Sequence, residues 1–320
     1  MRSLGTRCQD RILQVPFTRR SPQLHPRMML PRLRYLLSRV SMPSRRRRLL
    51  VERFGEPIHL NLISLAVALF GGVRSKIDHD LIIRQQFAFP LLYAADLAKL
   101  RGYKAFTAIE FGVASGAGLM NMSHIADMVE RETAIQIKIV GFDTGTGMPP
   151  PLDYRDLPEL WQAGDFKMDE QALRAKLPTR CSLQLGQLQQ TIPTFMASLA
   201  GDAPIGFVSI DVDYYSSTVE ALKVFEFDAE NYLPIVCTYL DDIIVDSISD
   251  WSGELLAINE FNLRTQMRKI SPFPFLRPKR LFQRARWIDQ IFLCHIHDHR
   301  LRQPGAIKTD IRVIDNKFIE

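Results

Sequence analysis

Cysteine is scarce in this 320-residue chain, and its four cysteines are far apart. No C-x-x-C pair occurs among Cys8, Cys181, Cys237 and Cys294, which argues against a structural zinc site and against a disulfide framework. We interpret the four side chains as reduced thiols, mostly buried, and expect a cytoplasmic protein.

Long apolar runs are also missing. The longest one, 58–73, contains His59 and Asn61 and is too short and too polar to span a membrane. We predict an N-terminal packing helix here that ends at Gly71-Gly72, because glycine often terminates helices. The sequence therefore predicts no membrane span.

Residues 1–48 contain no lysine and only one acid, Asp10, but thirteen arginines. Their balance of +12, set against +6 for the whole chain, leaves −6 for the remaining residues. The presumed folded part thus has no evident basic patch, and we expect no nucleic-acid partner. The Arg-rich head is interpreted as a disordered extension, with three alternatives: a targeting peptide, an arm for anionic surfaces, or sequence upstream of the true start.

From about residue 52 onward, strand-like and helix-like stretches alternate, which is typical of an α/β fold with a mostly parallel sheet covered by helices on both faces. Seven strands are predicted, at 106–111, 137–142, 182–185, 205–210, 235–240, 270–275 and 287–295. Helices are predicted at 81–100, 117–131, 187–199, 216–227 and 253–268. No internal repeat is visible.

We divide the chain into four parts: a disordered extension at 1–50, a helical segment at 51–104, the main α/β domain at 105–300, and a C-terminal tail at 301–320. The run 144–178 interrupts the alternation of strands and helices. It begins with glycines and prolines and follows a strand, so we expect a lid or substrate wall. A surface excursion without function is the alternative.

The most informative stretch is 108–118, in which a strand, a glycine-rich turn and a helix follow one another. Its spacing is E-x-G-x-x-x-G-x-G, carried by Glu110, Gly112, Gly116 and Gly118, with Ser115 inside the turn. Glycine lets a backbone approach a ligand closely. The spacing differs from the G-x-G-x-x-G of dinucleotide sites, and the acid suits a ligand with a cationic amino group better than a phosphate. The turn resembles motif I of class I S-adenosylmethionine (SAM) methyltransferases.

Acids follow the carboxyl ends of other strands. Asp143 ends the second strand, where a carboxylate can accept hydrogen bonds from the ribose hydroxyls of a ligand. Asp211 and Asp213 follow the fourth strand, and Asp241 and Asp242 follow the fifth. In a parallel sheet these strand ends meet at one edge, so we expect the acids to converge there.

Asp211, Asp241 and Asp242 in one place would repel each other unless a cation neutralised them. Oxygen donors without histidine or cysteine favour Mg²⁺ over zinc, and such an ion would orient a substrate hydroxyl and lower its pKa. Helix caps or salt bridges are the alternative roles. For the catalytic base we consider Asp213 first, and Asp211 as a residue that combines both tasks. Ser216 or Ser217 is expected to cap the next helix.

Taken together, these motifs resemble the TylF-like, or macrocin O-methyltransferase, family of Mg²⁺-dependent sugar O-methyltransferases. The resemblance rests on the glycine turn, on Gly141-Phe142-Asp143, on Gly186-x-Leu188, on D-x-D-x-Y from Asp211, and on Asp241-Asp242, in this order over about 85–300. It implies a Rossmann-like class I methyltransferase fold. It also implies that Glu110, Gly112, Ser115, Gly116, Gly118, Asp143 and Gly186 bind SAM, and that Asp211, Asp241 and Asp242 bind the metal.

The sequence thus predicts a SAM-dependent O-methyltransferase that acts on a hydroxylated small molecule, such as a sugar or a glycosylated natural product. Two alternatives remain open, a non-catalytic SAM-binding protein and a Rossmann-type oxidoreductase. A homo-oligomer is also left open.

Two further features each have two possible interpretations. His295, His297 and His299 alternate on the last strand and are a metal-site candidate, with a polar strand edge as the alternative. Four aromatic residues could wall a ring-shaped acceptor or simply contribute to packing: Trp161, Tyr214, Tyr215 and Trp251.

Overall fold

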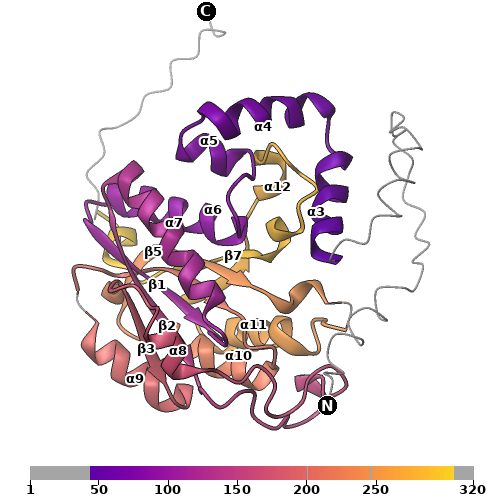
Figure 1. Cartoon of the computed structure of the whole chain (residues 1–320). Helices are drawn as coiled ribbons and strands as arrows, with labels where there is room; N and C mark the ends of the chain where they lie inside the picture. The colour runs from indigo at the N-terminus through magenta and orange to yellow at the C-terminus, as the bar shows by residue number, and fades with distance from the viewer. Residues whose placement is uncertain (1–43, 200, 246, 306–320) are drawn as a thin grey trace, which may run out of the picture.

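The chain folds around a seven-stranded sheet in the order β3-β2-β1-β4-β5-β7-β6 (Figure 1). This computed structural model describes residues 44–199, 201–245 and 247–305. The strands are β1 Ala105–Phe111, β2 Gln136–Asp143, β3 Cys181–Leu185, β4 Ile205–Ile210, β5 Tyr232–Leu240, β6 Arg268–Pro272 and β7 Ile291–Ile296. The first five are parallel, and β7 is antiparallel to both β5 and β6. The predicted α/β fold with a mostly parallel seven-stranded sheet is confirmed.

Helices cover both faces of the sheet. They are α3 Ser44–Gly55, α4 Ile58–Phe70, α5 Val73–Asp78, α6 Gln85–Leu100, α7 Ala117–Thr133, α8 Glu170–Arg174, α9 Leu188–Ser198, α10 Tyr215–Leu222, α11 Gly253–Arg264 and α12 Leu276–Lys279. One core cluster joins the sheet to α6 and α7, and the other joins it to α9, α10 and α11. Figure 1 shows these two layers on either side of the strands.

Strand β1 illustrates why the sheet is central, since all seven of its residues are buried. Its side chains alternate between the two layers, as the pleat of a strand requires. Phe106 and Ala108 pack in the cluster with α6 and α7, whereas Ile109 and Phe111 pack in the cluster with α9, α10 and α11. This alternation puts Glu110 on the α7 side, a position that matters for the site described below.

Some predicted boundaries differ from the structure. The helix expected from residue 81 begins at Gln85, because the chain before it bends and Arg84 has the left-handed backbone conformation, with φ at 57°. Strand β5 begins at Tyr232, three residues earlier than predicted. The strand expected from 287 begins at Ile291, after a 3-10 turn over Arg286–Gln290.

The N-terminal region differs more. Residues 44–50, which we placed in the extension, are the beginning of α3. Helix α4 ends before Gly71, as expected, but Ser64 is its one buried residue, so the prediction of a packing helix is wrong in that respect. The rest of the Arg-rich head, 1–43, lies outside the described residues, as does Cys8. Within the described part of the chain, no helix is long and apolar enough to cross a membrane.

Candidate active site

The glycine-rich turn leads from β1 into α7, and its first glycine lies against the neighbouring strand end. Gly112 has φ at 88°, and a Cβ atom on it would overlap with the carbonyl oxygen of Asp211. A bond from Asp211 N to Phe111 O at 3.0 Å brings the end of β4 against this turn, and a bond from Gly112 N to Phe142 O of β2 at 2.9 Å fixes the turn on its other side. Only glycine fits here, both for its backbone angle and for its size.

Glu110 is buried beneath the first turn of α7. Its Oε1 lies where a side chain on Gly118 would be, and its Oε2 has no hydrogen-bond partner among the described residues. Burial raises the pKa of Glu110 to about 8; Arg84 opposes this rise and Asp143 adds to it. A buried carboxyl with an unpaired oxygen is costly unless something pairs with it, so this residue is a strong candidate for contact with a polar or cationic group.

Asp143 closes β2 and holds the turn in place. Its Oδ2 accepts from Ala114 N at 2.8 Å, and its Oδ1 accepts from Gly145 N at 2.7 Å. Asp143 also lines a cavity at the carboxyl ends of the strands. Asp143 therefore ties the glycine turn to the start of the insertion, and each carboxylate oxygen retains a lone pair for a ligand.

The other predicted cofactor residues lie around this turn without lining the cavity. Ser115 is exposed, and Gly116 has φ at 81° and leaves room for Leu173 of α8. Gly118 accommodates Glu110. Gly186 follows β3, where its N–H donates to Asp143 O at 3.0 Å. The structure thus gives Gly116 and Gly118 packing roles that the sequence did not reveal.

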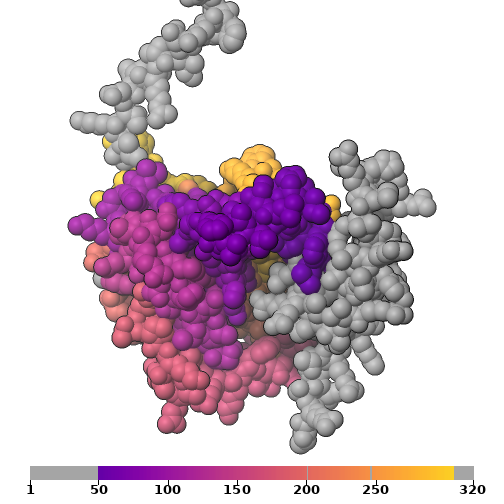
Figure 2. Space-filling view, turned by 45° about the horizontal axis from the view of Figure 1, so that its top comes forward, coloured from indigo at the N-terminus to yellow at the C-terminus, as the bar shows by residue number. Residues whose placement is uncertain are grey.

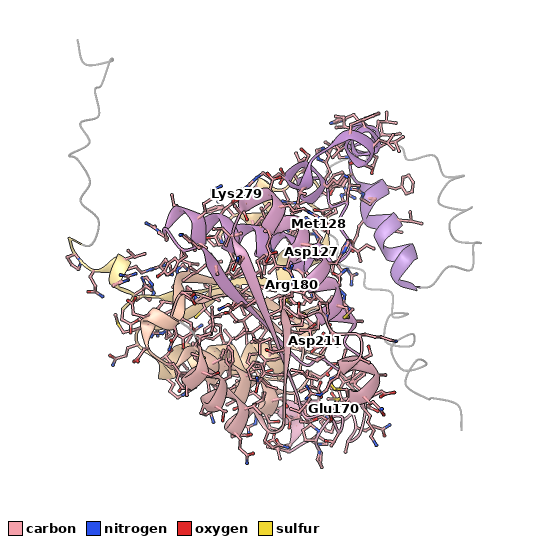
Figure 3. The ribbon with its side chains drawn as sticks, turned by 60° about the vertical axis from the view of Figure 1, so that its left-hand side comes forward. Asp127, Met128, Glu170, Arg180, Asp211 and Lys279 are labelled. Carbon is pink, nitrogen blue, oxygen red and sulfur yellow. The ribbon has the colours of Figure 1, made fainter. Side chains whose placement is uncertain are left out.

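Asp211, Asp213, Asp241 and Asp242 all line the same cavity, which has a volume of about 540 Å³. Asp241 N donates to Ile210 O at 3.1 Å, which sets the end of β5 beside the end of β4. Asp213 has a left-handed backbone with φ at 60°, and its N–H donates to Asp242 Oδ2 at 3.1 Å. The predicted convergence of the acids at one sheet edge is therefore present in the structure. Figure 3 labels Asp211 among the side chains of the sheet and its covering helices.

The clustered acids raise one another's pKa values. Burial and then the charges of Asp241, Asp242 and Glu110 hold the pKa of Asp211 well above its usual range, and Arg84 opposes this. Burial is the largest cause that raises the pKa of Asp213, to about 8. The negative charges of Asp211, Asp241 and Asp165 add to this rise. Burial also raises the pKa of Asp242, and the negative charges of Asp213 and Asp241 raise it further. Within the described residues no ion pair neutralises these four acids, so a bound cation would be favoured here.

A layer of residues behind the acids holds them in place, and sequence reasoning missed it. Gln290 Nε2 donates to Asp241 O at 2.7 Å and to the hydroxyl of Tyr239 at 3.2 Å, and that hydroxyl donates to the Asp241 carboxylate. Glu254 is fully buried and accepts from Asp242 N at 3.1 Å. These residues come from β5, α11 and the turn before β7, and only their proximity in the fold connects them with the acids.

As these side chains are placed, no set of three or more His, Cys, Asp or Glu residues in the described part of the chain is arranged to hold a metal ion. The chemistry of the donors nevertheless fits a hard dication, since the cavity offers carboxylate oxygens and neither thiolate nor imidazole. The predicted metal site thus remains a proposal that depends on the acids' chemistry and not on a formed coordination sphere.

The insertion 144–178 closes over the cavity and is anchored by a buried carboxylate. Asp156 is fully buried; it accepts from Ser216 N at 2.8 Å, from Ser216 Oγ at 2.9 Å and from Leu152 N at 2.8 Å. A negative charge at the start of α10 also favours the helix dipole. The expected cap by Ser216 or Ser217 is wrong, because Ser216 donates to the acid from the insertion and neither serine caps the helix.

The wall of the cavity opposite the acids comes from the insertion and from the segment after β3. It consists of Thr144, Gly147, Met148, Pro149, Pro150, Leu152, Trp161, Phe166, Gln187, Leu188 and Gln189. The volume is within the range of small-molecule sites. Most of these residues were not predicted individually, although the insertion as a whole was predicted as a substrate wall.

Of the four aromatic candidates, only Trp161 lines the cavity, where its ring lies 6.0 Å from that of Phe166. Tyr214 is buried, and Trp251 is exposed outside the cavity. Tyr215 donates to Glu260 at 2.5 Å and is covered by the guanidinium of Arg155 at 4.4 Å. Tyr214, Tyr215 and Trp251 therefore do not wall the cavity; they pack within the fold or lie on its surface.

Of the three histidines expected on the last strand, only His295 lies in β7, since the strand ends at Ile296; within the described residues the three do not form a metal site. His295 and His297 stack with their ring centroids 5.7 Å apart, and the Nδ1 atoms of both face the guanidinium of Arg302, at 3.2 and 3.3 Å. His299 is buried and turned elsewhere, accepting from Leu301 N. Burial is the largest cause that lowers the pKa values of His295 and His297, and the positive charge of Arg302 lowers them further. The polar strand edge is the better interpretation.

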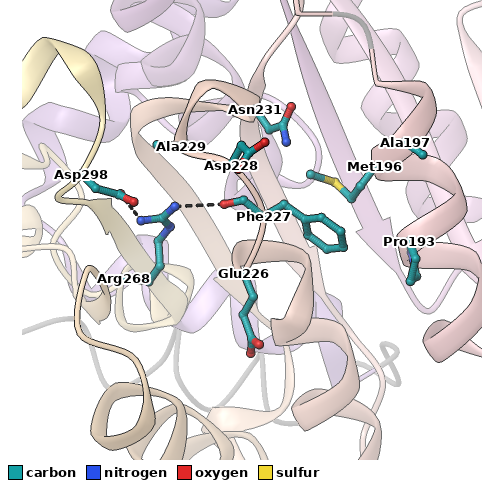
Figure 4. Close-up of a pocket in the computed structure, with 10 residues that line it drawn as sticks. All are labelled: Pro193, Met196, Ala197, Glu226, Phe227, Asp228, Ala229, Asn231, Arg268 and Asp298. Atoms are coloured by element: carbon teal, nitrogen blue, oxygen red, sulfur yellow. Dashed lines mark hydrogen bonds and ion pairs between the residues drawn. The ribbon is translucent and has the colours of Figure 1, made fainter.

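A second hollow lies near the other end of the strands, between α9, the segment before β5, and β6 (Figure 4). Arg268 crosses it, donating to Phe225 O at 3.1 Å and to Phe227 O at 3.0 Å and pairing with Asp298. All of these contacts are internal, so Arg268 joins three segments of the fold and we assign this hollow no ligand.

Comparisons with known proteins give limited information. No family model matches the chain, and no curated protein matches it. Among solved structures, the chain is similar to the crystal structure of CalS11, a calicheamicin methyltransferase, with 19% identity, a TM-score of 0.43, and coverage of 84% of this chain and 91% of that one. The apo structure of CalS11, described as a TDP-rhamnose 3'-O-methyltransferase, gives 20% identity, a TM-score of 0.38, and coverage of 84% and 93%.

Proposed function

We propose that this chain is a SAM-dependent O-methyltransferase that methylates a hydroxyl group of a small acceptor, such as a sugar or a glycosylated natural product. One observation carries the proposal: the glycine turn and the acid cluster meet in a single cavity, with Gly112 directly against Asp211. A cofactor held by the turn would therefore face an acceptor held by the acids.

The residues around the turn fit SAM in kind. Gly112 and Ala114 line the cavity with backbone, Asp143 offers carboxylate oxygens suited to ribose hydroxyls, and Glu110 offers a buried carboxyl suited to a cationic amino group. A bound SAM would supply a methyl group on a positively charged sulfur that leaves readily. The negative potential of the four acids favours a cation in this cavity.

For the acceptor, the acids bind and orient the reacting hydroxyl. We assign Asp213 as the residue that takes its proton, because its carboxylate lines the cavity and its N–H donates to Asp242, which fixes it among the other acids. Asp211 is the alternative base. Asp211, Asp241 and Asp242 would hold Mg²⁺, which would fix the hydroxyl and lower its pKa.

The insertion supplies the other half of the pocket. Trp161 and Phe166 present an apolar wall, and Asp156 fixes the insertion to α10 beside Ser216 and Ser217, which also line the cavity. A pocket walled on both sides would align the reacting atoms, and alignment is worth up to about 7–11 kcal/mol in favourable cases.

A methyl-transfer assay tests this function. The protein would be incubated with SAM, Mg²⁺ and separate pools of free sugars, nucleotide sugars and glycosylated natural products, and each pool searched by mass spectrometry for a gain of one methyl group. We expect transfer to at least one pool, strongly reduced in Asp213→Asn and unchanged in Asp202→Asn, whose side chain is exposed outside the cavity.

Two outcomes would favour the alternatives. Binding of SAM without transfer to any pool, together with indifference to Asp211→Asn and to Mg²⁺, would indicate a non-catalytic SAM-binding protein. Binding of NAD(H) in place of SAM would indicate an oxidoreductase.

A further inference from the structure

Asp241 is held from behind by two buried side chains. Tyr239 is 2% exposed and Gln290 is 4% exposed, and neither belongs to the residues that line the cavity. The hydroxyl of Tyr239 donates to Oδ1 of the Asp241 carboxylate. Gln290 reaches the same two residues, because its Nε2 lies 3.2 Å from the Tyr239 hydroxyl and 2.7 Å from the backbone oxygen of Asp241. The three residues therefore form one hydrogen-bonded group.

The amide of Gln290 fixes the direction of the Tyr239 hydroxyl. An amide nitrogen only donates, so the tyrosine oxygen accepts that bond, and the single proton of the phenol is left for Asp241. The carboxylate of Asp241 is thus bound through Oδ1 by a donor of fixed direction. Its Oδ2 forms no hydrogen bond within the described residues and is available to a ligand in the cavity that Asp241 lines.

The ring of Tyr239 is itself held by packing. It lies edge-on to the ring of Phe87 of α6, with the centroids 5.7 Å apart, and belongs to the core cluster that also includes Ile77 of α5. In Figure 2 the indigo N-terminal segment, which contains α5, covers the upper part of the molecule. Since ring and hydroxyl are both fixed, the carboxylate of Asp241 has a set orientation before any ion binds.

Resting on the metal site of the proposed function, we propose that Tyr239 and Gln290 are positioning residues that set the affinity of the acid cluster for a hard dication. A carboxylate that is already oriented loses less conformational freedom when it binds an ion. The bond from Tyr239 also offsets part of the repulsion that Asp211 and Asp242 exert on Asp241. Removing a hydrogen bond of this kind typically costs about 10- to 100-fold in metal affinity.

The chain offers a matched control on the same strand. Tyr232 is also buried in β5, and its hydroxyl donates to Val224 O at 2.7 Å and accepts from Phe227 N at 3.1 Å. It is the first residue of the strand, whereas Asp241 follows the last one. Replacing either tyrosine by phenylalanine removes a buried, hydrogen-bonded hydroxyl, but only the hydroxyl of Tyr239 contacts an acid of the cluster.

Titration of the full chain with Mn²⁺ alone tests the proposal, with the free ion followed by electron paramagnetic resonance. Mn²⁺ prefers the same oxygen ligands as Mg²⁺. We expect the dissociation constant to rise about 10-fold or more in Tyr239→Phe and in Gln290→Leu, and to stay unchanged in Tyr232→Phe. In the double variant the loss should be smaller than the product of the two single losses, because both residues act on one carboxylate. Circular dichroism verifies that each variant is folded.

Three results would overturn the proposal. The first is an unchanged dissociation constant in both single variants while Mn²⁺ binds the unchanged protein, which would leave the proposed function intact. The second is an equal rise in Tyr232→Phe, since this would show that lost stability and not orientation weakens binding. The third is failure of Mn²⁺ to bind the unchanged protein, which would remove the metal site as well. Binding of S-adenosylhomocysteine, measured separately, then shows whether the rest of the proposed function stands.

Discussion

Gly112 lies so close to the carbonyl oxygen of Asp211 that no other residue can occupy its position. This contact joins the end of β1, where the glycine turn begins, to the end of β4, where the acids begin. The two parts of the proposed site are thus in direct backbone contact, and neither can shift without the other.

Replacing Gly112 by alanine should disrupt the site and the fold together. A Cβ atom would overlap with Asp211 O, and φ at 88° is unfavourable for alanine. Gly102→Ala is the matched control, because its φ is 80° but nothing lies within 4 Å of the added atom. In urea unfolding we expect a loss of about 1 kcal/mol for the control and clearly more for Gly112→Ala.

Calorimetry with S-adenosylhomocysteine should show a parallel difference. Gly102→Ala should bind it like the unchanged protein, and Gly112→Ala should not. Equal stability and equal binding in both variants would mean that the close approach of Gly112 and Asp211 is unimportant.

Asp156→Asn should loosen the insertion. The amide cannot accept at both positions, so one of the bonds from Ser216 or Leu152 is lost inside the protein, at a cost of about 1–3 kcal/mol. Limited proteolysis should cut within 157–169 much faster, and KM for the acceptor should rise. Asp153→Asn, which affects a half-exposed pair with Arg155, is the control and should change cleavage little. Unchanged cleavage in Asp156→Asn would show that the insertion is held by other contacts.

Glu110 should make stability depend on pH. Its pKa is about 8 in the folded chain and ordinarily 4.5, so between these values the folded state retains a proton that the unfolded state releases. The folded state then binds more protons, and the free energy of unfolding falls as pH rises from about 4.5 to 8. Asp211 and Asp213 have raised pKa values and act in the same direction.

Glu110→Gln should therefore flatten this fall without abolishing it, as measured by urea unfolding between pH 5 and 8. Glu170→Gln, at an exposed position on α8, should leave the slope as it is. A slope in Glu110→Gln identical to that of the unchanged protein would contradict the assignment of a neutral, buried Glu110.

Mg²⁺ should stabilise the protein by neutralising the acid cluster. We expect the melting temperature to rise with millimolar Mg²⁺ and to return after chelation. Asp211→Asn should be more stable than the unchanged protein without metal, because repulsion is relieved, and should not respond to Mg²⁺. Asp202→Asn should respond normally. If Mg²⁺ does not change the melting temperature of the unchanged protein, the proposed metal site is wrong.

The sequence predicted the fold well because the evidence for each element was local. Apolar runs such as 106–111 and 205–210 coincide with β1 and β4 to within a residue. The convergence of Asp211, Asp213, Asp241 and Asp242 also followed from their places at strand ends. Parallel strands meet at one edge, so this reasoning needed no tertiary information.

The remaining features depend on contacts between distant segments. Asp156 reaches Ser216 across 60 residues, and Gln290 reaches Asp241 across 49, so no spacing in the sequence could reveal these pairs. Gly116 is predicted to bind SAM, and the structure shows in addition that it makes room for Leu173, a contact that no spacing in the sequence could reveal. The exposure of α4 could not be predicted either, because an apolar helix has the same sequence pattern whether or not its own chain covers it.

The most direct test of the central claim is a calorimetric titration of the folded protein with S-adenosylhomocysteine in the presence of Mg²⁺, with NAD(H) as the comparison ligand. We expect S-adenosylhomocysteine to bind with micromolar affinity, this binding to be lost in Gly112→Ala, and NAD(H) not to bind. Absence of S-adenosylhomocysteine binding in a protein shown by circular dichroism to be folded would contradict the account, and the glycine turn would then be only a corner between β1 and α7.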